Sequence, residues 1–463
     1  MTTQIAGLPF WELALDAQGD PDPALERTLV TEAGQQGITD LFVFSHGWNN
    51  DRSIAMKLYT AFFTLLASQL HHRRNAATTV GLVGVHWPAR RWSDEPIPNF
   101  DPAPAGGGDG SASLGAASTD RALASSVSST VELDPATLAD LEELFPDAAL
   151  ELRRMAELLT GPPTPEAVQE FKSRLDAFAA TGAGEDDGED TRDRDAAEPG
   201  MLQDDAQALF TRFRDAARAQ GVLDEDTDGG AAGVGDRLRG IWRGAKEALR
   251  QATYWQMKNR AGVVGKQGLG PLIGRVHEQL PGVRFHLVGH SFGARLVSFA
   301  LAGLPAMQPS PVGSVTLLQG AFSHFAFADP LPFAAGRRGA LAGMLSRIDG
   351  PLVVCFSEHD GAVGTFYPLA SMAARDDSAA AERALWRWGG MGADGAQGVG
   401  AVLQAIGGAG PGTDYPFVPK GVLNVDAASV VRRGRPPSGA HSDIVHPELT
   451  WVVLAASRIV KTS

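Results

Sequence analysis

The chain has 463 residues, of which 44% are hydrophobic and 20% are charged, a composition typical of soluble globular proteins. Its formal net charge of -14 disfavours binding to nucleic acids and to anionic lipid surfaces, because both are themselves negatively charged. The single cysteine, Cys355, lies in an apolar run typical of a buried residue and has no second cysteine with which to form a disulfide.

The sequence shows no targeting or membrane-spanning segment. Its first ten residues lack a basic stretch followed by a long apolar one, and no run approaches the roughly 18 apolar residues that span a bilayer. We therefore predict a cytoplasmic protein without integral membrane association. Export by a signal-independent secretion system would leave the same pattern.

Three strands are predicted near the N-terminus. Residues 8–15 form the first, and residues 40–45 and 79–85 are apolar runs rich in β-forming residues, the pattern of strands buried on both faces. The segment 46–50, His-Gly-Trp-Asn-Asn, follows the second strand. Apolar residues at helical spacing then predict a helix over 56–70.

The middle of the chain, residues 93–260, has a different character. It contains no strand pattern, and we predict a helical insertion, a candidate lid, with flexible loops. Capping signals such as Asp134-Pro135 and apolar spacing predict helices over 135–160, from Thr164, over 201–219 and over 236–258. The predicted loops are acidic or rich in Gly, Ala, Ser and Pro: 101–130, 182–200 and 224–235.

Strands and helices alternate again after residue 260. We predict strands at 284–289, 312–318, 352–356 and within 421–431, and helices at 272–280, 291–301, 366–388 and 447–459. This alternation predicts a mostly parallel sheet covered on both faces, an α/β fold. The chain then divides into 1–92, the first half of the core, 93–260, the insertion, and 261–463, the second half.

A nucleophile elbow is predicted at Ser291. The segment Gly289-His-Ser-Phe-Gly293 matches G-x-S-x-G, directly follows a predicted strand and directly precedes a predicted helix. The two glycines leave room where a Cβ would clash in so tight a turn, and the helix N-terminus favours negative charge at the reacting centre. A serine that merely caps the helix is the alternative interpretation.

With this motif the chain resembles the α/β-hydrolase superfamily, over most of residues 1–90 and 265–463. The resemblance implies an α/β-hydrolase fold and an oxyanion hole made of backbone N–H groups. The family's H-G-x motif stands here as His46-Gly-Trp48, which implies the N–H groups of Trp48 and Phe292 as the donors, with His46 supporting the loop. The insertion departs from the family, whose lid follows the strand after the elbow.

The family's order of serine, acid and histidine implies the acid of a catalytic triad. Asp360 follows the predicted strand 352–356, and a carboxylate just past the end of that strand shares the edge of the sheet with Ser291. Asp360 is therefore the expected acid, with Glu358 and Asp329 as competitors.

The base is expected on the loop between the last strand and the last helix. His441 fits that position, whereas His446 lies at the mouth of the helix and is expected to cap or pack. An alternative interpretation takes His441, Asp443 and His446 as metal ligands, but no H-E-x-x-H motif accompanies them. No P-loop or dinucleotide fingerprint is present either, so we predict neither a metal nor a cofactor.

The resemblance also implies a place for the substrate. The segment after the strand 312–318 borders the acyl pocket in the resembled fold, which makes Gln319, Phe322 and Phe325 candidate substrate-binding residues, although ordinary core packing explains the aromatic residues equally well. Residues 236–260 lead back into the core and are expected to line the substrate entrance.

The expected function is that of a serine hydrolase that cleaves a small or apolar carboxylic ester through an acyl-enzyme. Two alternatives remain: a lipase or phospholipase with the insertion as its lid, and a non-catalytic interaction protein on a hydrolase scaffold. The partner expected in the first two cases is a small-molecule ester or a lipid.

Overall fold

The computed structural model describes residues 3–70, 78–89, 92, 100, 131–181, 205–219, 234–334, 336–363, 389–434 and 438–460. Nine strands form one sheet in the order β1-β2-β4-β3-β5-β6-β7-β9-β8. The first pair, β1 and β2, is antiparallel, and every other pair is parallel. The strands are β1 (Thr3–Ile5), β2 (Leu8–Ala14), β3 (Asp40–Ser45), β4 (Val80–His86), β5 (Arg284–His290), β6 (Val312–Leu318), β7 (Leu352–Phe356), β8 (Val402–Ala405) and β9 (Val422–Asp426).

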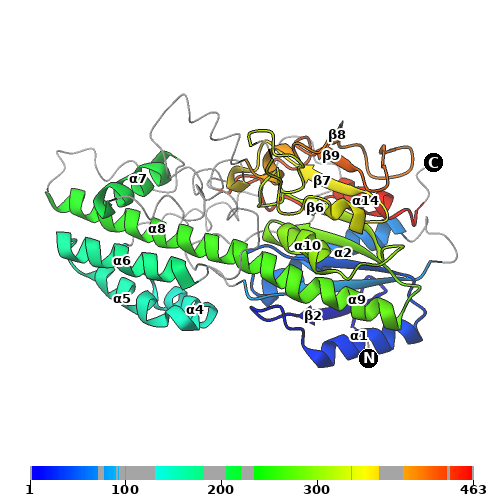
Figure 1. Ribbon diagram of the computed structural model, residues 1–463, viewed down its shortest axis with the longest axis horizontal. Coiled ribbons are helices and arrows are strands. Elements are labelled where there is room, and N and C mark those ends of the chain that lie inside the picture. Colours follow the sequence, from blue (N-terminus) through cyan, green and yellow to red (C-terminus); the bar gives the residue numbers. More distant parts are fainter. Residues whose placement is uncertain are drawn as a thin grey trace, which may run out of the picture.

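Helices cover both faces of this sheet, as Figure 1 shows. Side chains alternate along β3: Leu41 and Val43 join one core with α10, whereas Phe42 and Phe44 join the other with α2 and α14. The prediction of a mostly parallel α/β sheet is thereby confirmed. The helices around the sheet are α1 (Pro23–Gln35), α2 (Arg52–Leu70), α9 (Gly270–Gln279), α10 (Phe292–Gly303), α13 (Met391–Asp394) and α14 (Pro447–Ser457).

The direction of winding reverses between β3 and β5, which are neighbours in the sheet. The chain leaves β3 through α2 on one face and returns as β4, but it leaves β5 through α10 on the other face and returns as β6. At such a switch point the two loops diverge, and the crevice between them is where open α/β sheets bind ligands.

Helices make up the described part of the chain between β4 and β5. They are α4 (Pro135–Leu144), α5 (Ala149–Thr160), α6 (Pro165–Thr181), α7 (Ala206–Ala219) and α8 (Val234–Val263), with a short 3-10 turn at Pro146–Ala148. Helix α8 runs through a π-helical segment, Val264–Leu269, directly into α9. At a rise of about 1.5 Å per residue, the rod from Val234 to Gln279 is roughly 70 Å long. It joins the outlying helices to the sheet (Figure 1).

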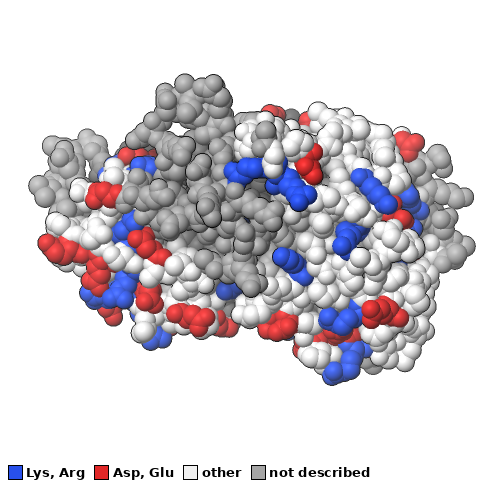
Figure 2. Space-filling view, viewed as in Figure 1, with Lys and Arg blue, Asp and Glu red and all other residues white. Residues whose placement is uncertain are grey.

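Both signs of charge are mixed over the outlying helices (Figure 2). Arg154 of α5 bonds to Glu170 of α6 at 2.7 Å, and Arg153 bonds to Glu142 of α4 at 2.8 Å. Such exposed pairs contribute little stability, so the hydrophobic side chains between these helices hold them together. None of the described helices combines the length and the apolar character needed to cross a bilayer.

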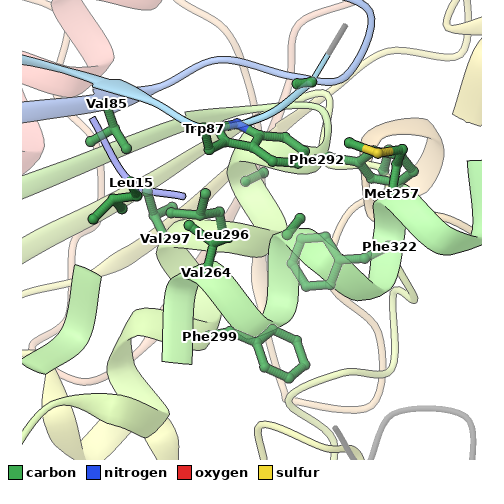
Figure 3. Packing of buried hydrophobic residues seen from close by; sticks show 14 of the residues in the cluster. Leu15, Val85, Trp87, Met257, Val264, Phe292, Leu296, Val297, Phe299 and Phe322 are labelled. Carbon is green, nitrogen blue, oxygen red and sulfur yellow. The ribbon is translucent and has the colours of Figure 1, made fainter. Parts of the chain in front are cut away.

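The rod packs backbone against backbone on α10. A Cβ on Gly265 would lie 2.1 Å from the carbonyl oxygen of Leu296, and one on Gly270 would lie 2.3 Å from that of Ala300. The buried Arg295 donates from Nε to the carbonyl of Lys258 at 2.9 Å, which ties α8 to α10 just before the π-helical segment. Figure 3 shows Met257 and Val264 of the rod together with Phe292 and Leu296 of α10.

Several elements were not predicted from the sequence. The strands β1 and β8 and helix α1 were missed, and the predicted helix 272–280 is the end of the long rod. The predicted loops at 101–130 and 182–200, residues 224–233 of the third, and the predicted helix 366–388 lie outside the described residues. The remaining predicted strands agree with the structure to within a few residues at their ends.

We expect the substitution Gly265→Ala to destabilise the fold by about 1–3 kcal/mol, because its Cβ meets backbone that cannot move independently. This loss outweighs the gain of about 1 kcal/mol that alanine gives in a helix. Gly282→Ala is the matched control, since nothing lies within 4 Å of its Cβ, and it should change stability by less than about 0.5 kcal/mol. Urea unfolding measures both, and equal midpoints would contradict the packing argument.

Candidate active site

Ser291 lies at a sharp turn between β5 and α10, with φ 58° and ψ -123°. A non-glycine residue in this region is strained, and strain of this kind persists where the surrounding structure fixes it. A Cβ on Gly293 would lie 2.0 Å from the carbonyl oxygen of Ser45, and one on Gly289 would lie 2.4 Å from that of Gly293. The turn therefore depends on both glycines of the motif, as the sequence predicted.

The loop after β3 lies directly against this turn. A Cβ on Gly47 would lie 2.6 Å from the Cβ of Ser291, so the two segments are in backbone contact. The side chain of Asn50 donates to the carbonyls of Gly47 and Trp48 and so closes the loop on itself. Phe292 is the first residue of α10, and its N–H has no acceptor within the helix. Trp48 and Phe292, the predicted oxyanion donors, thus flank the serine.

His46, at the start of the same loop, holds it in place through hydrogen bonds and ring stacking. Its Nδ1 donates to the carbonyl of Gly47 at 2.8 Å, its backbone N–H donates to Tyr59, and its ring stacks on Trp87. Burial, with a smaller contribution from His86, lowers the pKa of His46 to about 3. The ring is therefore neutral at physiological pH and serves the loop as a fixed hydrogen-bond donor.

Asp360 and His441 form a hydrogen-bonded pair. The Nδ1 of His441 donates to Oδ2 of Asp360 at 2.8 Å, and the carboxylate, which is fully buried, accepts a second bond from the N–H of Val363. With the proton on Nδ1, the imidazole presents an unprotonated Nε2, as a general base must. The competitors Glu358 and Asp329 are both exposed.

The pair lies beside the elbow. The rings of His290 and His441 are 4.9 Å apart, and Nε2 of His290 lies 2.8 Å from the backbone oxygen of His441. Among the described residues the hydroxyl of Ser291 makes no hydrogen bond, so the structure brings serine and histidine to the same place without joining them. Such bonds are often long before substrate binds.

A residue of the inserted helix completes the wall of the site. The ring of Tyr254 of α8 lies 5.6 Å from that of Trp48 and 4.7 Å from that of Phe292, measured between centroids. One aromatic side chain therefore touches both residues that carry the expected oxyanion donors. The sequence placed the segment 236–260 at the entrance, but nothing in its pattern singled out Tyr254.

The candidate substrate residues are buried. Phe322 and Phe325 have 0% and 2% of their surface exposed, and Phe322 belongs to the core shared with α10. Gln319 adopts φ 45° at the end of β6, and neither polar atom of its buried side chain has a hydrogen-bond partner among the described residues. The residues around it, Leu318 and Ala321, both form backbone hydrogen bonds with Ser291, which places the backbone of Gln319 next to the elbow.

Two further histidines near this edge pair with carboxylates of their own. Nε2 of His446 bonds to Asp443 at 2.8 Å, apart from the pair formed by His441. In the described part of the chain no three His, Cys, Asp or Glu residues are placed to hold a metal. A further pair, His324 with Asp394, was not predicted from the sequence because its members are far apart in the chain.

A second trio of serine, histidine and aspartate lies at the opposite end of the strands. His286 bonds through Nδ1 to Ser314 at 2.9 Å and through Nε2 to Asp40 at 3.1 Å. All three side chains are buried within the sheet, and Ser314 lies inside β6, where it pairs with His286 just after a register shift between β5 and β6. Because all three residues are at most 5% exposed, the trio offers no access to a substrate and is part of the core.

Comparisons with known proteins do not assign the chain to a family: no family model, no curated protein and no solved structure matches it.

Stability should decline as the pH falls below about 6.5, the pKa of an unfolded histidine. Burial lowers the folded-state pKa of His46 and His290 to about 3, and it also lowers the pKa of His286. Between these values the unfolded chain binds protons that the folded chain excludes, so each residue removes up to about 1.4 kcal/mol per pH unit. Urea unfolding from about pH 7 to pH 4 should show a shallower decline for His46→Gln, and an unchanged slope would contradict this assignment.

Proposed function

We propose that this chain is a serine hydrolase of the α/β-hydrolase fold that cleaves a carboxylic ester. The observation that carries the proposal is the buried Asp360–His441 pair beside the strained turn at Ser291. Three loops that are distant in sequence supply the three groups that a serine hydrolase needs. Ser291 is the nucleophile, His441 is a base whose Nε2 is unprotonated, and the carboxylate of Asp360 fixes this tautomer. The order of the three residues is that of the resembled family.

In the acylation step, Nε2 of His441 takes the proton of the Ser291 hydroxyl while the Oγ of Ser291 attacks the ester carbonyl carbon. The carbonyl oxygen becomes an anion that the N–H groups of Trp48 and Phe292 stabilise, and Asp360 stabilises the imidazolium. The imidazolium then protonates the departing alcohol, which leaves an acyl group on Ser291. Water attacks this acyl group in the reverse sequence, and the carboxylic acid and the free serine are restored.

The walls of the site favour a substrate with both apolar and polar parts. Trp48, Tyr254 and Phe292 offer aromatic surface to an apolar group. The unpartnered amide of Gln319 favours a hydrogen-bonding group on the substrate, because a buried amide left unbonded costs about 1–3 kcal/mol. These features support a small-molecule ester as the substrate.

A fluorophosphonate probe tests the proposed nucleophile. The wild-type chain should be labelled at Ser291, Ser291→Ala should abolish labelling, and His441→Gln should slow it by about 1000-fold or more. Ser314→Ala is the matched control, because it alters a buried serine that bonds to a histidine at the opposite end of the strands. Peptide mapping identifies the labelled residue, and a wild-type chain that stays unlabelled while folded would overturn the proposal.

Tyr254 should control the acyl length that the site accepts. Tyr254→Ala opens space beside Trp48 and Phe292, so the ratio of kcat/KM for an octanoate ester to that for an acetate ester should rise about 10-fold. Tyr254→Phe keeps the ring and should keep the wild-type ratio. If the alanine variant showed the ratio of the phenylalanine variant, α8 would not line the acyl site.

A further inference from the structure

His290 joins the nucleophile turn to the loop that carries the base. Its side chain is 2% exposed, and its Nε2 lies 2.8 Å from the backbone oxygen of His441. Because a carbonyl oxygen can only accept, Nε2 of His290 must carry the proton. Burial, reinforced by the nearby His441, lowers the pKa of His290 to about 3, so the ring is neutral and Nδ1 holds no proton.

This bond differs from the others that hold the histidine loop. The N–H of Ala440 donates to His359, and the N–H of Ala362 donates to Ser438, so backbone bonds fix the loop to the segment of the acid. Among the described residues, the bond from His290 is the one hydrogen bond that connects the turn 289–293 to the loop 438–446. The hydroxyl of Ser291 does not supply a second one.

We propose that His290 is a positioning residue: its Nε2–H holds the backbone of His441 at the distance from which the imidazole reaches the Ser291 hydroxyl. This inference rests on the proposed function. Without the bond, the histidine loop stays attached to the segment of the acid but loses its hydrogen bond to the nucleophile turn, so the imidazole of His441 is no longer held within reach of Ser291.

The neutral ring also suits the reaction. The imidazolium that forms on His441 during acylation lies 4.9 Å from the ring of His290, and a second positive charge there would oppose it. Among the described residues the buried Nδ1 of His290 has no hydrogen-bond partner, and in the neutral ring it carries no proton. A residue in this place must therefore donate one hydrogen bond and remain uncharged.

The substitutions His290→Gln and His290→Met test this directly, since the two side chains have similar length and differ in the N–H donor. The rate of fluorophosphonate labelling should fall about 10- to 100-fold in the methionine variant, and the glutamine variant should recover most of the loss. With an ester substrate the loss should appear in kcat, while KM stays within about twofold. Thermal unfolding and circular dichroism show whether each variant is folded.

The outcomes separate the two proposals. A folded wild-type chain that is not labelled overturns the proposed function itself. A labelled wild-type chain with an equally reactive methionine variant overturns the role of His290, as would folded glutamine and methionine variants that are equally slow. Should the methionine variant fail to fold, His290→Phe replaces it, because phenylalanine keeps a buried ring without a hydrogen-bond donor. The phenylalanine variant must then be labelled by the fluorophosphonate more slowly than His290→Gln.

Discussion

The close approach of two backbones at the switch point of the sheet is the constraint on which the site depends. The loop after β3 and the turn after β5 diverge to opposite faces, and Gly47 and Gly293 let them meet without side chains between them. Ser291 lies at this contact in its strained conformation, at the carboxyl edge of the sheet. The contact also leaves N–H groups of both segments without strand or helix acceptors, in the place where negative charge would develop.

The other two members of the site are fixed to this contact in different ways. Asp360 follows β7, and its loop is joined to the histidine loop by backbone hydrogen bonds around Gly439, whose φ of 56° suits glycine. These two loops form one unit on one side of the elbow. Helix α8 approaches from the other side, held to α10 by the bond from Arg295 and by close packing at Gly265. The elbow is thus the common support. A shift in the position of α10 would therefore displace the oxyanion loop, the base and Tyr254 together.

Much of this arrangement could be predicted from local signals. Long apolar runs such as 40–45 and 284–289 identified the buried strands, and the glycines around Ser291 identified the turn. The short edge strand β8 was missed because its side chains are mostly exposed and give no pattern, as with Val402 and Leu403. The contact of His290 with His441 could not be predicted either, since a hydrogen bond from a side chain to distant backbone depends on how two loops cross and leaves no spacing in the sequence.

The buried trio of Ser314, His286 and Asp40 shows why residue types alone do not define a site. Its three members are fully connected, because the histidine hydrogen-bonds to both the serine and the aspartate. Yet its serine lies inside strand β6 and is almost fully buried, so no substrate carbonyl could reach it. The candidate at Ser291 has the opposite character: among the described residues its hydroxyl makes no hydrogen bond, and a base is held nearby by a bond to its backbone. Reactivity requires these unmet hydrogen bonds, which a substrate can complete and a satisfied core cannot.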